Sequence, residues 1–452
     1  MLYFARRMCR ELLPSPAYRS NTGKPTMRSK KLYFATKTGF TIFVIFLLPS
    51  VVVPTPSPAQ TFKVLHIFHG PNGEGPTGQL ARDKAGNLYG TTQAGGAGKC
   101  QGSFDNTCGT AFMLDKTGKQ VWLHSFNGKN GFGPLAGLIR GPGGNLYGTT
   151  YLGGDTNRYA LGCGTVFKLH ANGTEKLLYQ FPGTPDGWFP KGPLARDAAG
   201  NLYGTTQQGG AFGSGYGTIY KVDKTDTETV LYSFTGGLDG CSPTGVVLDA
   251  AGNLLGATGG GGDPGNCTGY GVIFKLDPEG NFTVLHSFGG GDGSGPGPLI
   301  LDLQGNLYGT TQEGGAGDLC LGGCGTVFEL SPNRDGTWTE TLLYSFCSLE
   351  SCADGREPLA GLVRDDNGNL YGTTAFGGTS PCSGSGCGVV FEVGSGGTET
   401  VIHSFTGGRG GSQPSGALVQ SPAGVLYGVA TGGGDTKCFP PEGCGLVFRL
   451  TP

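Results

Sequence analysis

The sequence predicts an all-β fold, a seven-bladed β-propeller of four-stranded antiparallel blades. Three observations support it: a heptapeptide repeated seven times, a composition rich in turn residues, and chain ends that complement each other. The heptapeptide is GNLYGTT or a close variant, and its copies begin at Gly86, Gly144, Gly200, Gly252, Gly305, Gly368 and Gly424. The chain has 90 Gly and 28 Pro among 452 residues. Glycine at this density opposes long helices and favours short strands joined by turns.

Each repeat contains four strand-like segments. In the sixth repeat these segments span residues 359–365, 369–374, 388–393 and 399–405. The turn between the first two is DDNGN, which suits a tight hairpin with glycine at a positive φ. Four antiparallel strands per unit of about fifty residues are typical of a propeller, because a blade needs neighbours to bury both of its faces.

The two ends of the chain predict that the ring is closed. The last repeat stops after its third strand, residues 445–450, and residues 61–68 match the pattern of the missing fourth strand. Pairing of the two segments would complete the seventh blade. An open solenoid would gain nothing from this offset and would need polar caps.

Residues 1–59 form an N-terminal leader, and residues 60–452 a single propeller domain. The apolar run at 40–53 is too short for a comfortable membrane span; basic residues precede it and the small residues Ser57 and Ala59 follow it. This pattern is typical of a signal peptide, with Met27 as the expected true start. We therefore expect export to the periplasm or the medium, with no stable membrane span after cleavage. An uncleaved anchor is the alternative.

The charge of the remaining chain argues against nucleic-acid binding. Residues 1–59 carry nine of the 31 Lys and Arg residues and one of the 33 Asp and Glu residues, which leaves 22 basic and 32 acidic side chains, a net charge of −10. An acidic chain without a basic run is a poor binder of phosphate backbones.

The cysteines predict six disulfides in an exported protein. The expected pairs are Cys100–Cys108, Cys241–Cys267, Cys320–Cys324, Cys347–Cys352, Cys382–Cys387 and Cys438–Cys444. Cys163 is left over, because its repeat lacks the partner. A zinc site is the alternative, but the spacings vary and the pairs belong to different blades, so we expect no four thiolates to converge and no metal to be bound.

No catalytic residue is predicted. The chain has no GxSxG nucleophile elbow and no HExxH zinc motif. Four of the six histidines, His66, His124, His286 and His403, fall at one repeat position, where the other repeats have tyrosine. A position that accepts either ring favours packing over catalysis.

Candidate binding residues lie in the loops between second and third strands and between blades, which should emerge on one face. Asp155, Asp263 and Asp435 follow glycine pairs, and Asp-Gly turns contain Asp186, Asp239, Asp292 and Asp354. Aromatic residues accompany them: Tyr151, Trp188, Phe189, Phe212 and Phe376. The hypothesis is a sugar- or Ca²⁺-binding rim formed by Trp188, Phe189, Tyr151, Asp155, Asp263 and Asp435. The alternative is ordinary turn chemistry without a cofactor.

The repeated GNLYGTT, the glycine pair after it, and the segments GTVFKL and VLYSF resemble the GloVer tandem repeat of exported bacterial proteins. The resemblance covers residues 61–450. It implies an exported β-propeller-like protein, and it implies neither an activity nor catalytic residues. Relatives carry varied C-terminal sorting segments, whereas this chain ends at Pro452, which favours release over surface attachment.

Three functions stay open. The first is a non-enzymatic binding platform for a glycan or a cell-envelope protein, because loops vary while strands stay constant. The second is a lyase or hydrolase acting on carbohydrates or lactones. Its innermost strands would offer Arg82, Arg140, Arg196 and Arg364, which we otherwise expect to be solvated strand ends. The third is a purely structural envelope protein.

Overall fold

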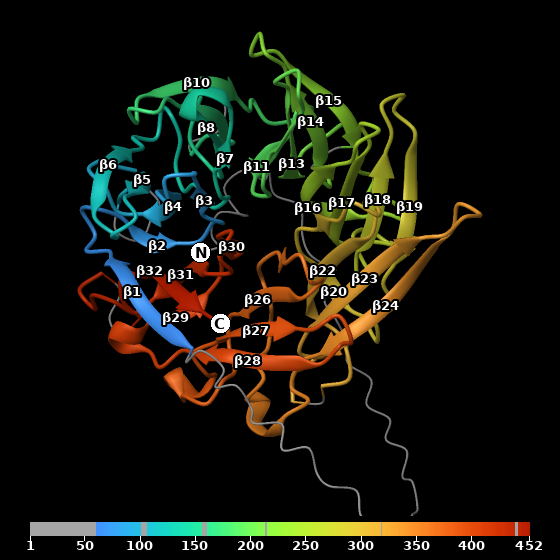
Figure 1. Cartoon of the computed structure of the whole chain (residues 1–452). Helices are drawn as coiled ribbons and strands as arrows, with labels where there is room; N and C mark the ends of the chain where they lie inside the picture. Colours follow the sequence, from blue (N-terminus) through green and yellow to red (C-terminus); the bar gives the residue numbers. More distant parts are fainter. Residues whose placement is uncertain (1–59, 101–105, 156–160, 213–214, 318, 439–441) are drawn as a thin grey trace, which may run out of the picture.

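The computed structural model describes residues 60–100, 106–155, 161–212, 215–317, 319–438 and 442–452. The leader, residues 1–59, lies outside the described residues, and so do the signal-peptide and start-site predictions. Seven antiparallel sheets surround a common axis as the blades of a closed propeller, which confirms the predicted fold (Figure 1).

The blades follow one another along the chain, and their strands have the following bounds. Blade 1 contains β2 (Glu74–Pro76), β3 (Ala81–Arg82), β4 (Leu88–Ala94), β5 (Thr110–Leu114) and β6 (Gln120–Ser125). Blade 2 contains β7 (Ile139–Arg140), β8 (Leu146–Thr150), β9 (Thr165–Leu169) and β10 (Glu175–Gln180). Blade 3 contains β11 (Trp188–Pro190), β12 (Ala195–Arg196), β13 (Leu202–Gln208), β14 (Thr218–Val222) and β15 (Glu228–Ser233). Blade 4 contains β16 (Cys241–Leu248), β17 (Leu254–Gly260), β18 (Val272–Leu276) and β19 (Phe282–Ser287).

The remaining three blades have the same order. Blade 5 contains β20 (Ser294–Pro296), β21 (Ile300–Leu301), β22 (Leu307–Glu313), β23 (Thr326–Pro332) and β24 (Trp338–Ser345). Blade 6 contains β25 (Val363–Arg364), β26 (Leu370–Thr374), β27 (Val389–Val393) and β28 (Glu399–Ser404). Blade 7 contains β29 (Ser412–Pro414), β30 (Val419–Gln420), β31 (Leu426–Gly432), β32 (Leu446–Thr451) and β1 (Thr61–Ile67). Four short 3-10 turns occur among the described residues: η1 (Pro142–Gly144), η2 (Glu350–Cys352), η3 (Cys382–Gly384) and η4 (Gly408–Gly410).

The first half of the heptapeptide builds the hairpin turn that precedes each second strand. In blade 1, Gly86 has a φ of +92° in that turn, as predicted. The backbone and side-chain nitrogens of Asn87 donate to the Asp83 carboxylate at 2.8 Å each, and the Tyr89 hydroxyl donates to it at 3.0 Å. Burial alone would raise the pKa of Asp83, but these hydrogen bonds outweigh it and hold the pKa below its usual value. The turn is therefore fixed by its own sequence.

The second half of the heptapeptide joins the strand to its neighbours. A Cβ on Gly90 would lie 2.6 Å from Cζ of Phe112, so only glycine admits this ring. The Thr91 hydroxyl donates to the Ala136 carbonyl of blade 2 at 3.0 Å. The Thr92 and Thr110 hydroxyls lie 2.7 Å apart across β4 and β5. Together these contacts explain why one heptapeptide recurs: it makes a turn, packs a strand and bonds to the next blade.

A ring of aromatic pairs fills the interfaces between blades. The phenylalanine after each fourth strand packs against an aromatic ring on the third strand of the next blade, with centroids 5.0–5.4 Å apart. The seven phenylalanines are Phe68, Phe126, Phe181, Phe234, Phe288, Phe346 and Phe405, all buried. Edge-on aromatic packing of this kind adds to the stabilisation from apolar burial.

The ring closes as predicted. β1 pairs antiparallel with β32 from Thr61 opposite Thr451 to Ile67 opposite Leu446, and Figure 1 shows the blue strand beside the red one. Phe62 also stacks on His403 of blade 6, with centroids 3.9 Å apart. The N-terminal strand thus completes blade 7 and seals its interface with blade 6.

Candidate functional site

The candidate site is the loop face, the edge where the loops between second and third strands and the linkers between blades emerge. In an antiparallel four-stranded blade these two kinds of connection leave at the same end, while the short hairpin turns leave at the other. The loop face therefore collects most of the segments whose length differs between blades.

All six predicted disulfides are present. They join Cys100–Cys108, Cys241–Cys267, Cys320–Cys324, Cys347–Cys352, Cys382–Cys387 and Cys438–Cys444. Cys163 belongs to none of them and is buried. The disulfides close loops of the loop face.

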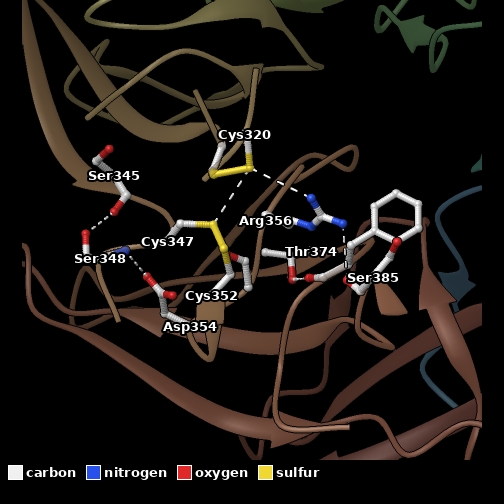
Figure 2. The surroundings of a disulfide bond; sticks show 12 residues. Cys320, Ser345, Cys347, Ser348, Cys352, Asp354, Arg356, Thr374 and Ser385 are labelled. Atoms are coloured by element: carbon white, nitrogen blue, oxygen red, sulfur yellow. Dashed lines mark hydrogen bonds between the residues drawn. A yellow bond between two sulfur atoms is a disulfide. The ribbon is translucent and has the colours of Figure 1, made fainter. Parts of the chain in front are cut away.

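The expectation that no four cysteine sulfurs converge is wrong for blade 5. The sulfurs of Cys320, Cys324, Cys347 and Cys352 all lie within 4.8 Å of one another (Figure 2). The first pair sits in the loop between β22 and β23, and the second in the linker after β24. They converge because this linker folds back over the loop of its own blade.

The three aromatic residues predicted to form a binding rim are packed inside the protein. Tyr151, Trp188 and Phe189 are only 6%, 3% and 1% exposed. Phe189 lies between the other two, with ring centroids 4.6 Å from Tyr151 and 5.8 Å from Trp188. These rings fill the interface of blades 2 and 3, so a ligand would have to displace core packing to reach them.

The carboxylates of the Asp-Gly turns accept hydrogen bonds from the ring at the fourth-strand His/Tyr position. The pairs are Tyr179–Asp186 (2.5 Å), Tyr232–Asp239 (3.0 Å), His286–Asp292 (3.0 Å) and Tyr344–Asp354 (2.8 Å). Asn72 and Asn130 replace the carboxylate beside His66 and His124. In six of the seven blades the ring thus ties the outer strand to the linker that follows it, which favours a structural role for both partners.

Two of the glutamates that approach these ring–acid pairs from the next blade have pKa values raised to about 7. Burial, and then the negative charge of Asp186, raise the pKa of Glu228 to about 7. Burial, and then the negative charge of Asp354, also raise the pKa of Glu399 to about 7. In blade 2 the equivalent residue, Glu175, instead accepts a hydrogen bond from Asn130.

The three remaining acidic candidates lie on different blades. Asp155 is exposed in blade 2 and lines a hollow of about 410 Å³ along β10. Asp263 is exposed in blade 4. In blade 7, Oδ2 of Asp435 lies 2.9 Å from Nδ1 of His69. The hydrogen bond between them is the largest cause of the lowered pKa of Asp435. No carboxylate of the described residues belongs to a group of three or more ligands, so binding of Ca²⁺ stays a prediction.

The sequence predicts that the four repeated arginines are solvated strand ends. Among them Arg140 is exposed, as predicted, but the other three are not. The other three guanidinium groups lie 5.4–5.8 Å from the centroid of a tyrosine ring of the preceding blade, in the pairs Arg82–Tyr427, Arg196–Tyr147 and Arg364–Tyr308. Such cation–π contacts stabilise the interfaces between blades.

The sequence analysis did not predict a group of exposed apolar side chains on the loop face. Six of the twelve exposed large apolar residues of the described chain lie in loops and linkers of blades 3–5: Phe212, Leu238, Tyr270, Leu319, Leu321 and Leu349. Apolar residues between glycine- and polar-rich loop segments are a signal that could have identified them. Isolated exposed apolar residues are normal, but their concentration on one face is typical of a contact surface.

The fold and these contacts define a closed, disulfide-bonded, seven-bladed repeat propeller. The repeat described as the Gloeobacter/Verrucomicrobia repeat matches residues 98–320 and 214–439. Because the two matches together cover well over half of the chain, the protein belongs to this family. No curated protein matches the chain in sequence.

Solved structures of low sequence identity resemble the chain. The extracellular domain of a candidate hybrid two-component system from B. thetaiotaomicron has 14% identity and a TM-score of 0.51, over 87% of this chain and 42% of that one. A gluconolactonase from Xanthomonas campestris has 15% identity and a TM-score of 0.39, over 68% of this chain and 82% of that one. The first of these similarities concerns the fold alone. Within the described residues no helix is long and apolar enough to span a membrane.

Proposed function

We propose that this protein is an exported, non-enzymatic interaction platform whose loop face on blades 3–5 binds a protein of the cell envelope. The observation that carries the proposal is the group of six exposed apolar side chains on one face of three consecutive blades. Six disulfides support export, because such bonds persist in oxidising compartments.

The chemistry of the exposed group favours a protein over a glycan. Four of its six members are leucines, Leu238, Leu319, Leu321 and Leu349. Leucine offers no flat ring for a sugar to stack on and no polar group to bond its hydroxyls. The rings of the predicted sugar-binding rim, Tyr151, Trp188 and Phe189, are buried, and the two exposed rings of the group, Phe212 and Tyr270, lie on different blades. Exposed leucines are instead suited to the dehydrated centre of a protein–protein contact.

The test is capture of partners from an envelope extract by the immobilised residue 60–452 protein, with identification by mass spectrometry. We expect a reproducible partner whose binding falls by about tenfold or more in a variant with Leu238→Ser, Leu321→Ser and Leu349→Ser. Leu303→Ser is the matched control, because Leu303 is as exposed as Leu321, at 101% and 102%, but lies in a hairpin turn on the opposite edge.

Two outcomes would contradict this proposal. One is equal binding by the wild type and the triple variant. The other is turnover of lactones or oligosaccharides by the purified protein, with metal added or removed, which would indicate the enzymatic alternative.

A further inference from the structure

The four-cysteine cluster of blade 5 has the geometry of a metal site as well as that of two disulfides. Sγ of Cys320 lies 3.8 Å from Sγ of Cys347, and all four sulfurs lie within 4.8 Å of one another (Figure 2). Zinc binds thiolates at about 2.3 Å in a tetrahedron, which places the sulfurs about 3.8 Å apart. The observed cluster is therefore already close to the size of a tetrathiolate site.

Other blades show that the second cysteine pair is an addition to a common plan. Blades 1, 6 and 7 also have a disulfide in the loop between second and third strands, but glycine in the adjacent linker. A Cβ on those glycines would face the disulfide sulfur: Gly128 toward Cys100 at 3.3 Å, Gly407 toward Cys382 at 2.9 Å, and Gly70 toward Cys438 at 3.7 Å. A cysteine in this part of the linker is thus placed to meet the sulfurs of the loop.

Cys352 occupies the backbone position of one of these glycines. Its carbonyl accepts from the amide of Gly378 at 2.9 Å, as the carbonyl of Gly70 accepts from Gly96 at 3.0 Å. Cys352 keeps a positive φ of 52°, and Cys347 has a φ of 60°. Residues with a Cβ rarely adopt such positive φ values. The four sulfurs therefore meet although the backbone of the linker resists side chains there, which points to a use beyond closing a short loop.

The charge and exposure around the cluster suit a site that opens on reduction. The Arg356 guanidinium lies 4.0 Å from Sγ of Cys320 and is held by a hydrogen bond to the Ser385 carbonyl at 3.4 Å. A fixed positive charge there favours thiolate over thiol. Cys324 and Cys352 are buried, whereas Cys320 and Cys347 are half-buried and can be reached from solvent.

We propose that Cys320, Cys324, Cys347 and Cys352 form a redox-controlled tetrathiolate site for Zn²⁺ or a similar soft cation. Two molecules of a dithiol reductant supply four electrons and four protons, breaking both S–S bonds, giving four thiols and leaving two oxidised dithiols. Zn²⁺ then displaces four protons and forms four Zn–S bonds. The site gains a net charge of −2, which Arg356 partly offsets. Two molecules of a disulfide oxidant reverse the exchange: each accepts two electrons and two protons and becomes a dithiol or two thiols, both S–S bonds of the protein re-form, and Zn²⁺ is released.

The experiment compares zinc binding by three forms of the residue 60–452 protein, reduced with a phosphine that competes weakly for zinc. We expect the reduced wild type to bind one equivalent with at least about 100-fold higher affinity than Cys347→Ser/Cys352→Ser, because removal of two ligands should exceed the loss seen for outer contacts. Cys382→Ser/Cys387→Ser is the matched control, since it removes one loop disulfide of the same spacing, and it should bind as the wild type does. The oxidised protein should bind no zinc at this site.

Two further measurements locate the site. Co²⁺ in place of zinc should give the visible absorption of a tetrahedral thiolate complex, and zinc should protect these four cysteines, and not Cys382 or Cys387, from alkylation. Circular dichroism on each reduced form reports whether the propeller persists. Equal affinity in the wild type and the Cys347/Cys352 variant would overturn the proposal. So would a reduced wild type that unfolds and does not recover with zinc.

Discussion

The hairpin edge and the loop face of the propeller are stabilised in different ways. On the hairpin edge, one turn is repeated: a carboxylate such as Asp365 accepts from the next asparagine and tyrosine in blades 1, 3, 5 and 6. On the loop face, the means of holding the loops varies among the blades. Blades 1, 6 and 7 use one disulfide in the loop, blade 4 joins its loop to β16, and blade 5 uses two disulfides.

This difference shows where the fold is maintained and where it is free to vary. The second strands bond to neighbouring blades, so a change in one blade would disturb the next. The loops of five blades carry disulfides of their own, and loops can change in length without moving the strands. Four predictions test this division, from the largest expected effect to the smallest.

The largest effect is expected on the loop face, for the disulfide that closes the longest loop. Cys241 and Cys267 are 26 residues apart, and Cys241→Ser/Cys267→Ser should lower the free energy of unfolding by about 3.5 kcal/mol, because the unfolded chain gains entropy. Urea unfolding monitored by fluorescence measures the loss. Cys382→Ser/Cys387→Ser opens a closure of only 5 residues and should lose about 2 kcal/mol. Equal losses would mean that local strain, and not loop length, decides how much each disulfide contributes to the free energy of unfolding.

The next effect is expected in the constant part of blade 6. A Cβ on Gly372 would lie 2.4 Å from Cζ of Phe391 and 2.9 Å from Cδ2 of Leu362, so Gly372→Ala should lower the free energy of unfolding by about 2–3 kcal/mol through overpacking. Gly396→Ala is the control in the same blade, because Gly396 is exposed and a Cβ there meets nothing within 4 Å. Its change should stay within about 0.5 kcal/mol. A tolerated Gly372→Ala would show that the third-strand ring can move.

A smaller effect is expected in the hairpin turn. The Asp365 carboxylate accepts from the Asn369 backbone at 2.8 Å and from the Tyr371 hydroxyl at 3.3 Å, so Asp365→Ala should cost about 1–2 kcal/mol. The neighbouring Asp366 is exposed, and Asp366→Ala should be nearly neutral. Thermal unfolding of both variants under the same conditions checks the difference. A similar loss in both would assign the effect to charge instead of hydrogen bonding.

The smallest effect concerns pH and the interface of blades 2 and 3. The pKa of Glu228 is raised from an ordinary 4.5 to about 7, so the folded protein binds more protons than the unfolded chain between these values. The stabilisation of the folded protein by the protonated Glu228 is complete below pH 4.5 and is lost as the pH rises through 7. Since Glu228 is half-buried, solvent screening reduces it, and Glu228→Gln should gain roughly 1 kcal/mol at pH 8 and nothing at pH 4.

The control for this pH dependence is Glu279→Gln, because Glu279 is exposed in a hairpin turn. It should leave the profile of unfolding free energy between pH 4 and 8 unchanged. A Glu228→Gln variant that keeps the full pH dependence of the wild type would mean that another group titrates in this range.

The propeller architecture and its disulfides could be predicted from the sequence, whereas contacts between loops could not. The turn at Gly86, the closing pair β1–β32 and the six disulfides follow from repeat register and local spacing, and the structure confirms them. The burial of Trp188 and the contact of Arg364 with Tyr308 were missed. Both depend on the angle between neighbouring blades, which no single repeat contains.

By itself, the sequence determined how many blades form and how the ring closes, because each heptapeptide carries its own turn, close-packed glycine and hydroxyl bonds. Only the tertiary structure decided which loop side chains meet, since the path of a linker depends on its length and on the blade beneath it. Cys320 and Cys347 illustrate this point: they are 27 residues apart in the chain, yet their sulfurs lie 3.8 Å apart because the linker of blade 5 folds back over its loop.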